Sequence, residues 1–203
     1  MTSIITADII NSRKVASEQW MAPLKSVLNT YGKSPKDWEI YRGDEFQLEI
    51  KQPESALMAA IKIKALLKSF KLDARISIGV GDKDYSGKKI TESNGSAFQR
   101  SGTLFETLKK EKMTLAISSG NEELDQRLNL IFRLTFSITQ HWLPQSAAFV
   151  MTALDNQTLS QEEIGNLLGI NQSAVSQRQK RAQFDLIMEV EQYYREQIKK
   201  LSK

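Results

Sequence analysis

Residues 38–50 read WEIYRGDEFQLEI, and they decide how the N-terminal part of the chain folds. Apolar and polar side chains alternate on both sides of Arg42-Gly43-Asp44-Glu45, a pattern typical of two half-buried strands joined by a turn. We therefore expect a β-hairpin. Two adjacent carboxylates at its tip suit a divalent ion in a cleft, but a solvated acidic turn explains the same residues.

Composition restricts the classes of protein that the chain can represent. It has 203 residues, 40% of them hydrophobic and 26% charged, which is enough for one large or two small soluble domains. Cysteine is absent, so disulfides and thiolate metal sites are excluded. We see no signal peptide and no membrane span, and we expect a cytoplasmic protein. The net charge of +4 permits nucleic-acid binding without demanding it.

The hairpin lies within a regular order of elements. Residues 3–10 form a β-branched run that predicts a buried strand, interrupted near its end by Asp8. Helical patterns at residues 17–31 and 53–70 flank the hairpin, and a strand pattern follows at residues 74–81. Strand, helix, hairpin, helix, strand is the connectivity of a ferredoxin-like α+β sheet. Its first strand neighbours the hairpin, so Asp8 is expected beside the acidic tip.

The composition of the chain changes near residue 120. Residues 96–110 predict one more helix and residues 113–118 one more strand. Only helical patterns follow. We therefore predict two domains, an α+β domain over residues 1–120 and an all-α domain over residues 121–203.

Three N-terminal segments carry a family resemblance: DII at residues 8–10, RGDEF at residues 42–46 and SIGV at residues 77–80. Together they resemble the palm-type catalytic domain of class III nucleotide cyclases and GGDEF diguanylate cyclases. ADIINSR at residues 7–13 and GDEFQ at residues 43–47 are also similar to the bacterial SatD family, over about the first 110 residues. The resemblance implies a palm domain that binds a purine nucleotide with Mg²⁺ or Mn²⁺.

The same resemblance implies roles for individual residues. Asp8 and Asp44 correspond to the metal ligands, with Glu45 beside them. Arg42 and Gly43 stand where the cyclases place the guanine base, and Arg42 replaces a glycine there.

Residues 94–100, NGSAFQR, resemble the cyclase segment that supplies side chains to the transition state, which implies Gln99 and Arg100 as nucleotide contacts. The basic residues with which the cyclases bind phosphate have no clear counterpart. This departure and the replaced glycine favour sensing of a nucleotide over its turnover.

A second informative stretch is LSQEEIGNLLGINQSAVSQR at residues 159–178. Ser160 and Glu163 form a capping box, which marks the start of a helix. Gly165 leaves room for a crossing helix, and Gly169 makes the turn before the next one. This spacing resembles the helix-turn-helix of bacterial regulators and of sigma-factor region 4.

The resemblance to a helix-turn-helix implies that the second helix enters the major groove of duplex DNA. The expected contacts to base edges and phosphates are Gln172, Ser173, Ser176, Gln177, Arg178, Lys180 and Arg181. Gln179 departs from the pattern, since relatives usually place an apolar residue there. A helical hairpin that makes protein contacts is the alternative interpretation.

Apolar residues recur every three or four positions from Ala182 to Leu201, which predicts that this helix continues to the C-terminus. A helix of that length suggests docking or a homodimer.

The leading hypothesis is therefore a DNA-binding transcriptional regulator whose palm domain senses a nucleotide with a divalent metal. The alternatives are a metal-dependent nucleotidyl transferase or cyclase that carries a helix-turn-helix, and a non-catalytic module for protein assembly.

Overall fold

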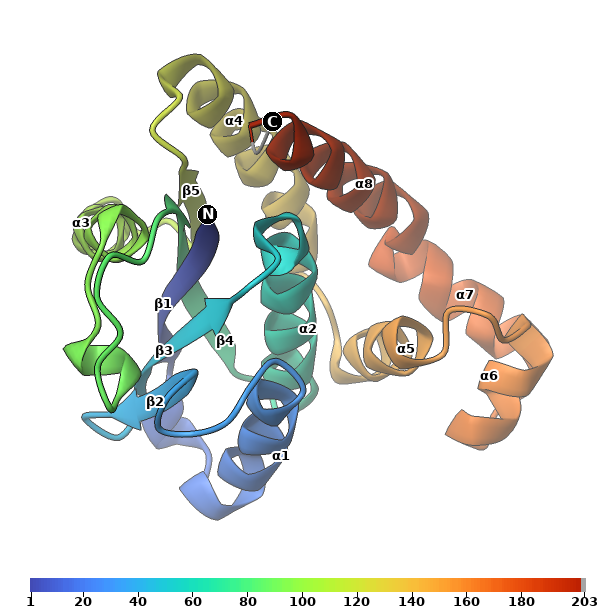
Figure 1. The fold of residues 1–203 in the computed structure, drawn as a ribbon. Helices are drawn as coiled ribbons and strands as arrows, with labels where there is room; N and C mark the ends of the chain where they lie inside the picture. Colours follow the sequence, from blue (N-terminus) through green and yellow to red (C-terminus); the bar gives the residue numbers. More distant parts are fainter. Residues whose placement is uncertain (202–203) are drawn as a thin grey trace.

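The computed structural model describes residues 1–201 of the chain (Figure 1). The elements are β1 (Thr2–Ile10), η1 (Ser12–Lys14), α1 (Ser17–Asn29), β2 (Trp38–Tyr41), β3 (Glu45–Ile50), η2 (Pro53–Ser55), α2 (Ala56–Ser69), β4 (Asp73–Gly81), η3 (Ile90–Glu92), α3 (Ser96–Glu111), β5 (Leu115–Ser118), α4 (Glu122–Thr139), α5 (Pro144–Asp155), α6 (Gln161–Leu168), α7 (Gln172–Ala182) and α8 (Phe184–Leu201).

The strands form one mixed sheet in the order β2-β3-β1-β4-β5. The first four are antiparallel neighbours, and β5 is added parallel to β4. This order confirms the predicted ferredoxin-like connectivity, extended by one strand. The hairpin is also confirmed, with Tyr41 opposite Glu45. Its turn passes through left-handed backbone at Arg42 (φ 51°) and Gly43 (φ 86°), a conformation that glycine adopts without strain.

Helices cover both faces of the sheet (Figure 1). Alternate residues of β1 point to opposite faces, so Ile5 and Ala7 join the core under α1 and α2 while Ile4 packs under α3. On the α3 face the backbones come very close. A Cβ atom placed on Gly79 of β4 would lie 2.2 Å from the carbonyl oxygen of Ala97, which explains the glycine at this position.

Helix α4 closes the free edge of β5 with its side chains. The Asn129 amide accepts from the Ile117 N–H at 2.8 Å and donates to the Ile117 carbonyl oxygen at 2.9 Å. Asp125 accepts from the Ser119 N–H at 2.8 Å. These contacts satisfy backbone groups that would otherwise offer an edge for pairing with another chain.

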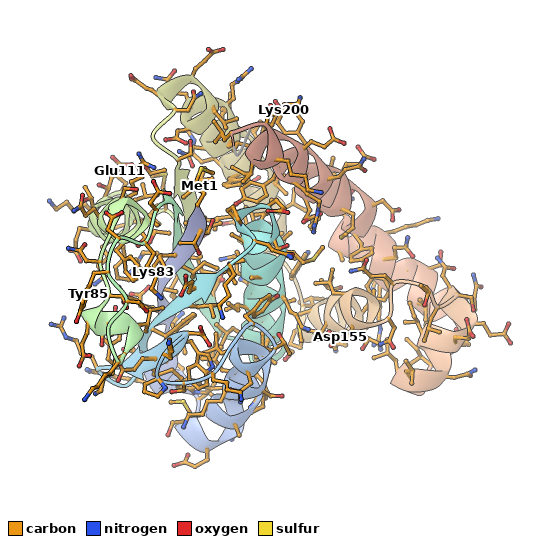
Figure 2. The ribbon with its side chains drawn as sticks, viewed as in Figure 1. Met1, Lys83, Tyr85, Glu111, Asp155 and Lys200 are labelled. Atoms are coloured by element: carbon orange, nitrogen blue, oxygen red, sulfur yellow. The ribbon has the colours of Figure 1, made fainter. Side chains whose placement is uncertain are left out.

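The helical part shares one continuous hydrophobic core with the sheet layer. Tyr194 of α8 is fully buried, and its hydroxyl donates to the Pro53 carbonyl oxygen at 2.9 Å. Lys62 of α2 forms an ion pair with Asp155 at the end of α5, where Figure 2 shows the two layers meeting. Within residues 1–201, no helix combines the length and apolarity that a bilayer crossing requires.

The prediction of one helix running on to Leu201 is wrong. Helix α7 ends at Ala182, Gln183 adopts a left-handed conformation (φ 51°), and α8 begins at Phe184. Tertiary contacts hold this break. The Trp142 indole N–H donates to the Ala182 carbonyl oxygen at 3.0 Å, and the Phe184 ring packs edge-on against Phe149 at 5.4 Å between centroids.

Candidate functional site: hairpin pocket and helix-turn-helix

The three acids that the sequence suggested as metal ligands gather at one end of the sheet. Asp8 and Glu45 are direct partners in the β1–β3 ladder, and Asp44 lies at the adjoining hairpin tip. The Ser12 hydroxyl donates to an Asp44 carboxylate oxygen at 2.6 Å, which joins the chain after β1 to the hairpin.

Two of these acids already have cationic partners. The Arg75 guanidinium lies 2.7 Å from the Asp8 carboxylate, and the Lys109 ammonium lies 3.0 Å from Glu45. The second oxygen of Asp8, Oδ1, is buried without a hydrogen-bond partner, and so is Arg75 Nε. Burial raises the pKa of Asp8, and the nearby charge of Arg75 opposes that rise.

These residues do not form a metal centre in the present arrangement. Within residues 1–201 no group of three or more His, Cys, Asp or Glu side chains is placed to hold a metal ion. A divalent ion on Asp8 would compete with the guanidinium of Arg75 for the same carboxylate. Binding of Mg²⁺ or Mn²⁺ at Asp8, Asp44 and Glu45 therefore stays a prediction, in which the ion either uses Asp8 Oδ1 or displaces Arg75 from Oδ2.

Two pockets meet at the hairpin tip, with volumes of about 430 Å³ and about 360 Å³. Both are lined by Ser12, Arg13 and Asp44. Together they add three more cationic side chains, Lys14 and Arg75 in one pocket and Arg42 in the other. Four cations around two carboxylates make this hollow suited to an anionic ligand.

Sequence reasoning had singled out only one of these four cations, Arg42. Arg13 and Lys14 carried a usable signal, since they directly follow the strand that ends beyond Asp8. Arg75 had none, because only the β1–β4 register places it opposite Asp8.

The structure does not bring the other two predicted nucleotide contacts to this hollow. Gln99 and Arg100 lie on α3, and an Arg100 guanidinium N–H donates to the Val80 carbonyl oxygen at 2.5 Å. Val80 and its neighbour Gly81 lie at the end of β4, and in the sheet register Gly81 pairs with Thr2, at the opposite end of β1 from Asp8. Thr2 and Asp8 are about 20 Å apart at the usual rise of a strand.

The helix-turn-helix begins at the capping box that the sequence predicted. The Ser160 hydroxyl accepts from the Glu163 N–H at 3.3 Å, while the Ser160 N–H donates to the Glu163 carboxylate at 2.7 Å. The backbone hydrogen bond from Ser160 lowers the pKa of Glu163. The capping box therefore fixes Ser160 as the residue that caps the start of helix α6.

The turn between α6 and α7 depends on two glycines. Gly169 ends α6 with left-handed backbone (φ 65°). A Cβ atom on Gly165 would lie 2.6 Å from the carbonyl oxygen of Ile170, so only glycine lets the turn pack this closely. Asn171 then caps α7 by accepting from the Ala174 N–H at 2.9 Å, and Val175 is fully buried against α6.

Helix α7 turns its polar side toward solvent. Gln172, Ser173 and Gln177 are exposed, and Ser176 is half-buried. Figure 1 places α6 and α7 at the end of the molecule away from the sheet. The α7 face is therefore accessible to a large partner.

All the charged side chains between Ile164 in helix α6 and Phe184 at the start of helix α8 are positive. Residues 164–184 contain Arg178, Lys180 and Arg181 and no acidic residue. Lys180 and Arg181 are exposed and Arg178 is half-buried. Among the ion pairs of residues 1–201, none involves these three side chains. The far end of α7 thus presents cations that have no anionic partner within the described chain.

Comparison with known proteins supports this reading of the C-terminal part. Residues 122–183 match the family described as sigma-70, region 4. The match spans α4 to α7 and so includes the whole helix-turn-helix. No curated protein and no solved structure matches the chain. None of these comparisons supports the resemblance of the N-terminal part to SatD proteins or nucleotide cyclases, which stays a prediction.

Proposed function

We propose that the chain is a transcriptional regulator that binds duplex DNA through α6 and α7. The observation that carries this proposal is the combination, on one sigma-region-4-like helix, of exposed amide and hydroxyl side chains with three unpaired cations. Side chains of the first kind read base edges in the major groove, and cations neutralise phosphates.

In this proposal each helix has its own part. Helix α7 lies along the major groove with Gln172, Ser173, Ser176 and Gln177 toward the bases. Arg178, Lys180 and Arg181 follow in its last turns and reach the phosphate backbone. Helix α6 crosses the backbone and supports α7 through the Gly165–Val175 contact.

A double substitution tests this proposal. Arg178→Ala with Arg181→Ala removes two of the three cations, and we expect it to weaken binding to duplex DNA at low salt by at least tenfold. Arg127→Ala with Arg133→Ala is the matched control, since it removes the same charge from exposed positions of α4. Equal affinities for the α7 variant and the wild-type protein would refute the proposed interface.

We also propose that the hairpin pocket binds a purine nucleotide and that the chain senses it. The cationic lining of Arg13, Lys14, Arg42 and Arg75 supports this second function, because it supplies the partners for phosphates that the sequence motifs lacked. Sensing remains the form we favour over turnover.

Thermal unfolding with ATP or GTP, each with and without Mg²⁺ or Mn²⁺, tests the pocket. A ligand that binds only the folded state raises the melting temperature. We expect a rise with intact nucleotide, reduced by Arg13→Ala and unaffected by Arg127→Ala. A new nucleotide product would make the chain an enzyme. Absence of any shift would remove the nucleotide proposal and leave the DNA proposal standing.

A further inference from the structure

Four polar side chains form a continuous chain of hydrogen bonds across the helix-turn-helix. The Gln172 amide N–H donates to the Gln161 side-chain oxygen at 2.6 Å. The Gln161 amide N–H donates to Gln179 at 2.8 Å, and the Gln179 amide N–H donates to the Asp185 carboxylate at 2.7 Å. This glutamine relay, Gln172–Gln161–Gln179–Asp185, links the start of α7 to the start of α8.

The direction of every hydrogen bond in the relay follows from its last member. A carboxylate only accepts hydrogen bonds, so Gln179 must present its NH₂ group to Asp185. The Gln179 oxygen is then left to accept from Gln161, whose own oxygen is left to accept from Gln172. One negative charge thereby fixes the orientation of three amides that could otherwise each be turned by 180°.

Of the three amides whose orientation is fixed, that of Gln172 matters most for DNA recognition. Gln172 is the first residue of α7 and is exposed, at the end of the helix that enters the groove first. One of its amide hydrogens is held by Gln161, so the order of its oxygen and its second N–H is fixed. An amide reads adenine by accepting from N6 and donating to N7 at once, and this needs both groups in a fixed order.

We propose that Asp185 is a specificity-determining residue for DNA, which acts by positioning the Gln172 side chain through the glutamine relay. The proposal rests on the DNA-binding function proposed above and names how that site selects sequence. Asp185 itself does not touch a base. It orients the amide that does, and the base pair selected there carries an adenine.

The relay also explains why Gln179 stands where an apolar residue was expected. Gln179 and Gln161 line a pocket of about 390 Å³ whose other walls include Phe149, Phe184 and Met188. An amide in such a setting is costly unless it is hydrogen-bonded, and the relay satisfies both its donor and its acceptor.

Selection from a library of randomised DNA duplexes tests the proposal in the full-length chain. Wild-type protein, Gln172→Ala, Asp185→Asn and Glu189→Gln are compared. Asparagine matches the shape of aspartate but both donates and accepts, so it no longer dictates the direction of the relay. Glu189→Gln is the control, because it makes the same charge change one turn further along α8 at an exposed residue.

We expect wild-type protein to enrich a motif with a preference for adenine at one position. Gln172→Ala should lose the preference at that position. Asp185→Asn should lose the preference at that same position, by about fivefold to 150-fold, and keep the rest of the motif. Glu189→Gln should keep the whole motif. Gln179→Met, which breaks the relay with an unbranched apolar side chain beside Met188, should repeat the Asp185→Asn result without loss of stability.

A preference that survives in both Asp185→Asn and Gln179→Met, or a motif that Gln172→Ala does not change, would overturn the relay while leaving DNA binding intact. Failure of wild-type protein to enrich any sequence while it still binds duplex DNA would also overturn the relay. Failure to bind duplex DNA at all would remove the proposed function together with it.

Discussion

Substitution of Tyr194 by phenylalanine measures how firmly α8 holds the helical part to the sheet layer. The Tyr194 side chain is fully buried, its ring lies 6.2 Å from that of Phe132, and its hydroxyl donates to the Pro53 carbonyl oxygen at 2.9 Å. Burial raises the pKa of this hydroxyl far above its ordinary value, so it stays a donor at any working pH. Phenylalanine removes that hydrogen bond and the hydrogen-bonding contact between the Tyr194 hydroxyl and the Ser3 side chain.

The expected loss of stability depends on whether the Pro53 carbonyl oxygen keeps a hydrogen-bond donor in the variant. A buried acceptor left without a partner costs about 1–3 kcal/mol. The Ser3 hydroxyl also donates to this carbonyl, at 3.4 Å, so the oxygen is not abandoned in Tyr194→Phe. We therefore expect the unfolding free energy to fall by about 1 kcal/mol and the melting temperature by about 2–4 °C for a chain of this size.

Urea unfolding followed by tryptophan fluorescence and circular dichroism provides the measurement. Trp20 and Trp38 report on the sheet layer and Trp142 on the helical part, and all three are buried. Because both parts share one core, we expect a single transition with coincident probes. Tyr193→Phe is the control, since Tyr193 is only half-buried. Equal stability of Tyr194→Phe and wild type, or two separate transitions, would refute the reasoning.

Three further substitutions probe the turn, an ion pair and the helix break. Gly165→Ala places a Cβ atom 2.6 Å from the Ile170 carbonyl oxygen, so we expect it to cost about 1–3 kcal/mol and to lower DNA affinity, both measurable on the purified variant. Burial alone would raise the pKa of Asp73, but its ion pairs with Lys64 and Lys68 together outweigh burial and lower the pKa below its ordinary value. This stabilisation is present above about pH 4 and is lost as the pH falls through the lowered value, so Asp73→Asn should flatten the acid limb of the stability curve. Gln183→Gly relieves left-handed backbone at φ 51° and should raise the unfolding free energy by about 1 kcal/mol; a lower stability would show that the Gln183 side chain matters.

Local signals in the sequence predicted the features that are built locally. The alternation around Gly43 gave the hairpin, and the Ser160 capping box with Gly169 gave both helices of the helix-turn-helix, because caps and turns depend on residues only a few positions apart. The order of elements was then enough to predict the connectivity of the sheet, since few topologies satisfy it.

Features that depend on distant partners could not be predicted in this way. The apolar spacing continues through Gln183, and only the contacts of Trp142 and Phe149 reveal the break there. Arg75 meets Asp8 through the sheet register, 67 residues apart in the chain. The glutamine relay likewise joins Gln172 to residues from three helices, so the reason for Gln179 became visible only in three dimensions.

The salt dependence of duplex binding tests the central claim, that α7 binds DNA, most directly. Neutralisation of phosphates by Arg178, Lys180 and Arg181 predicts that the logarithm of the association constant falls linearly with the logarithm of salt concentration, with a slope near −2.7 or steeper, about −0.9 for each phosphate. The Arg178→Ala, Arg181→Ala variant should reduce the magnitude of this slope by about 1.8. The account would be contradicted if the variant bound duplex DNA with the same salt slope as the wild-type protein. It would also be contradicted if the wild-type protein did not bind duplex DNA at low salt.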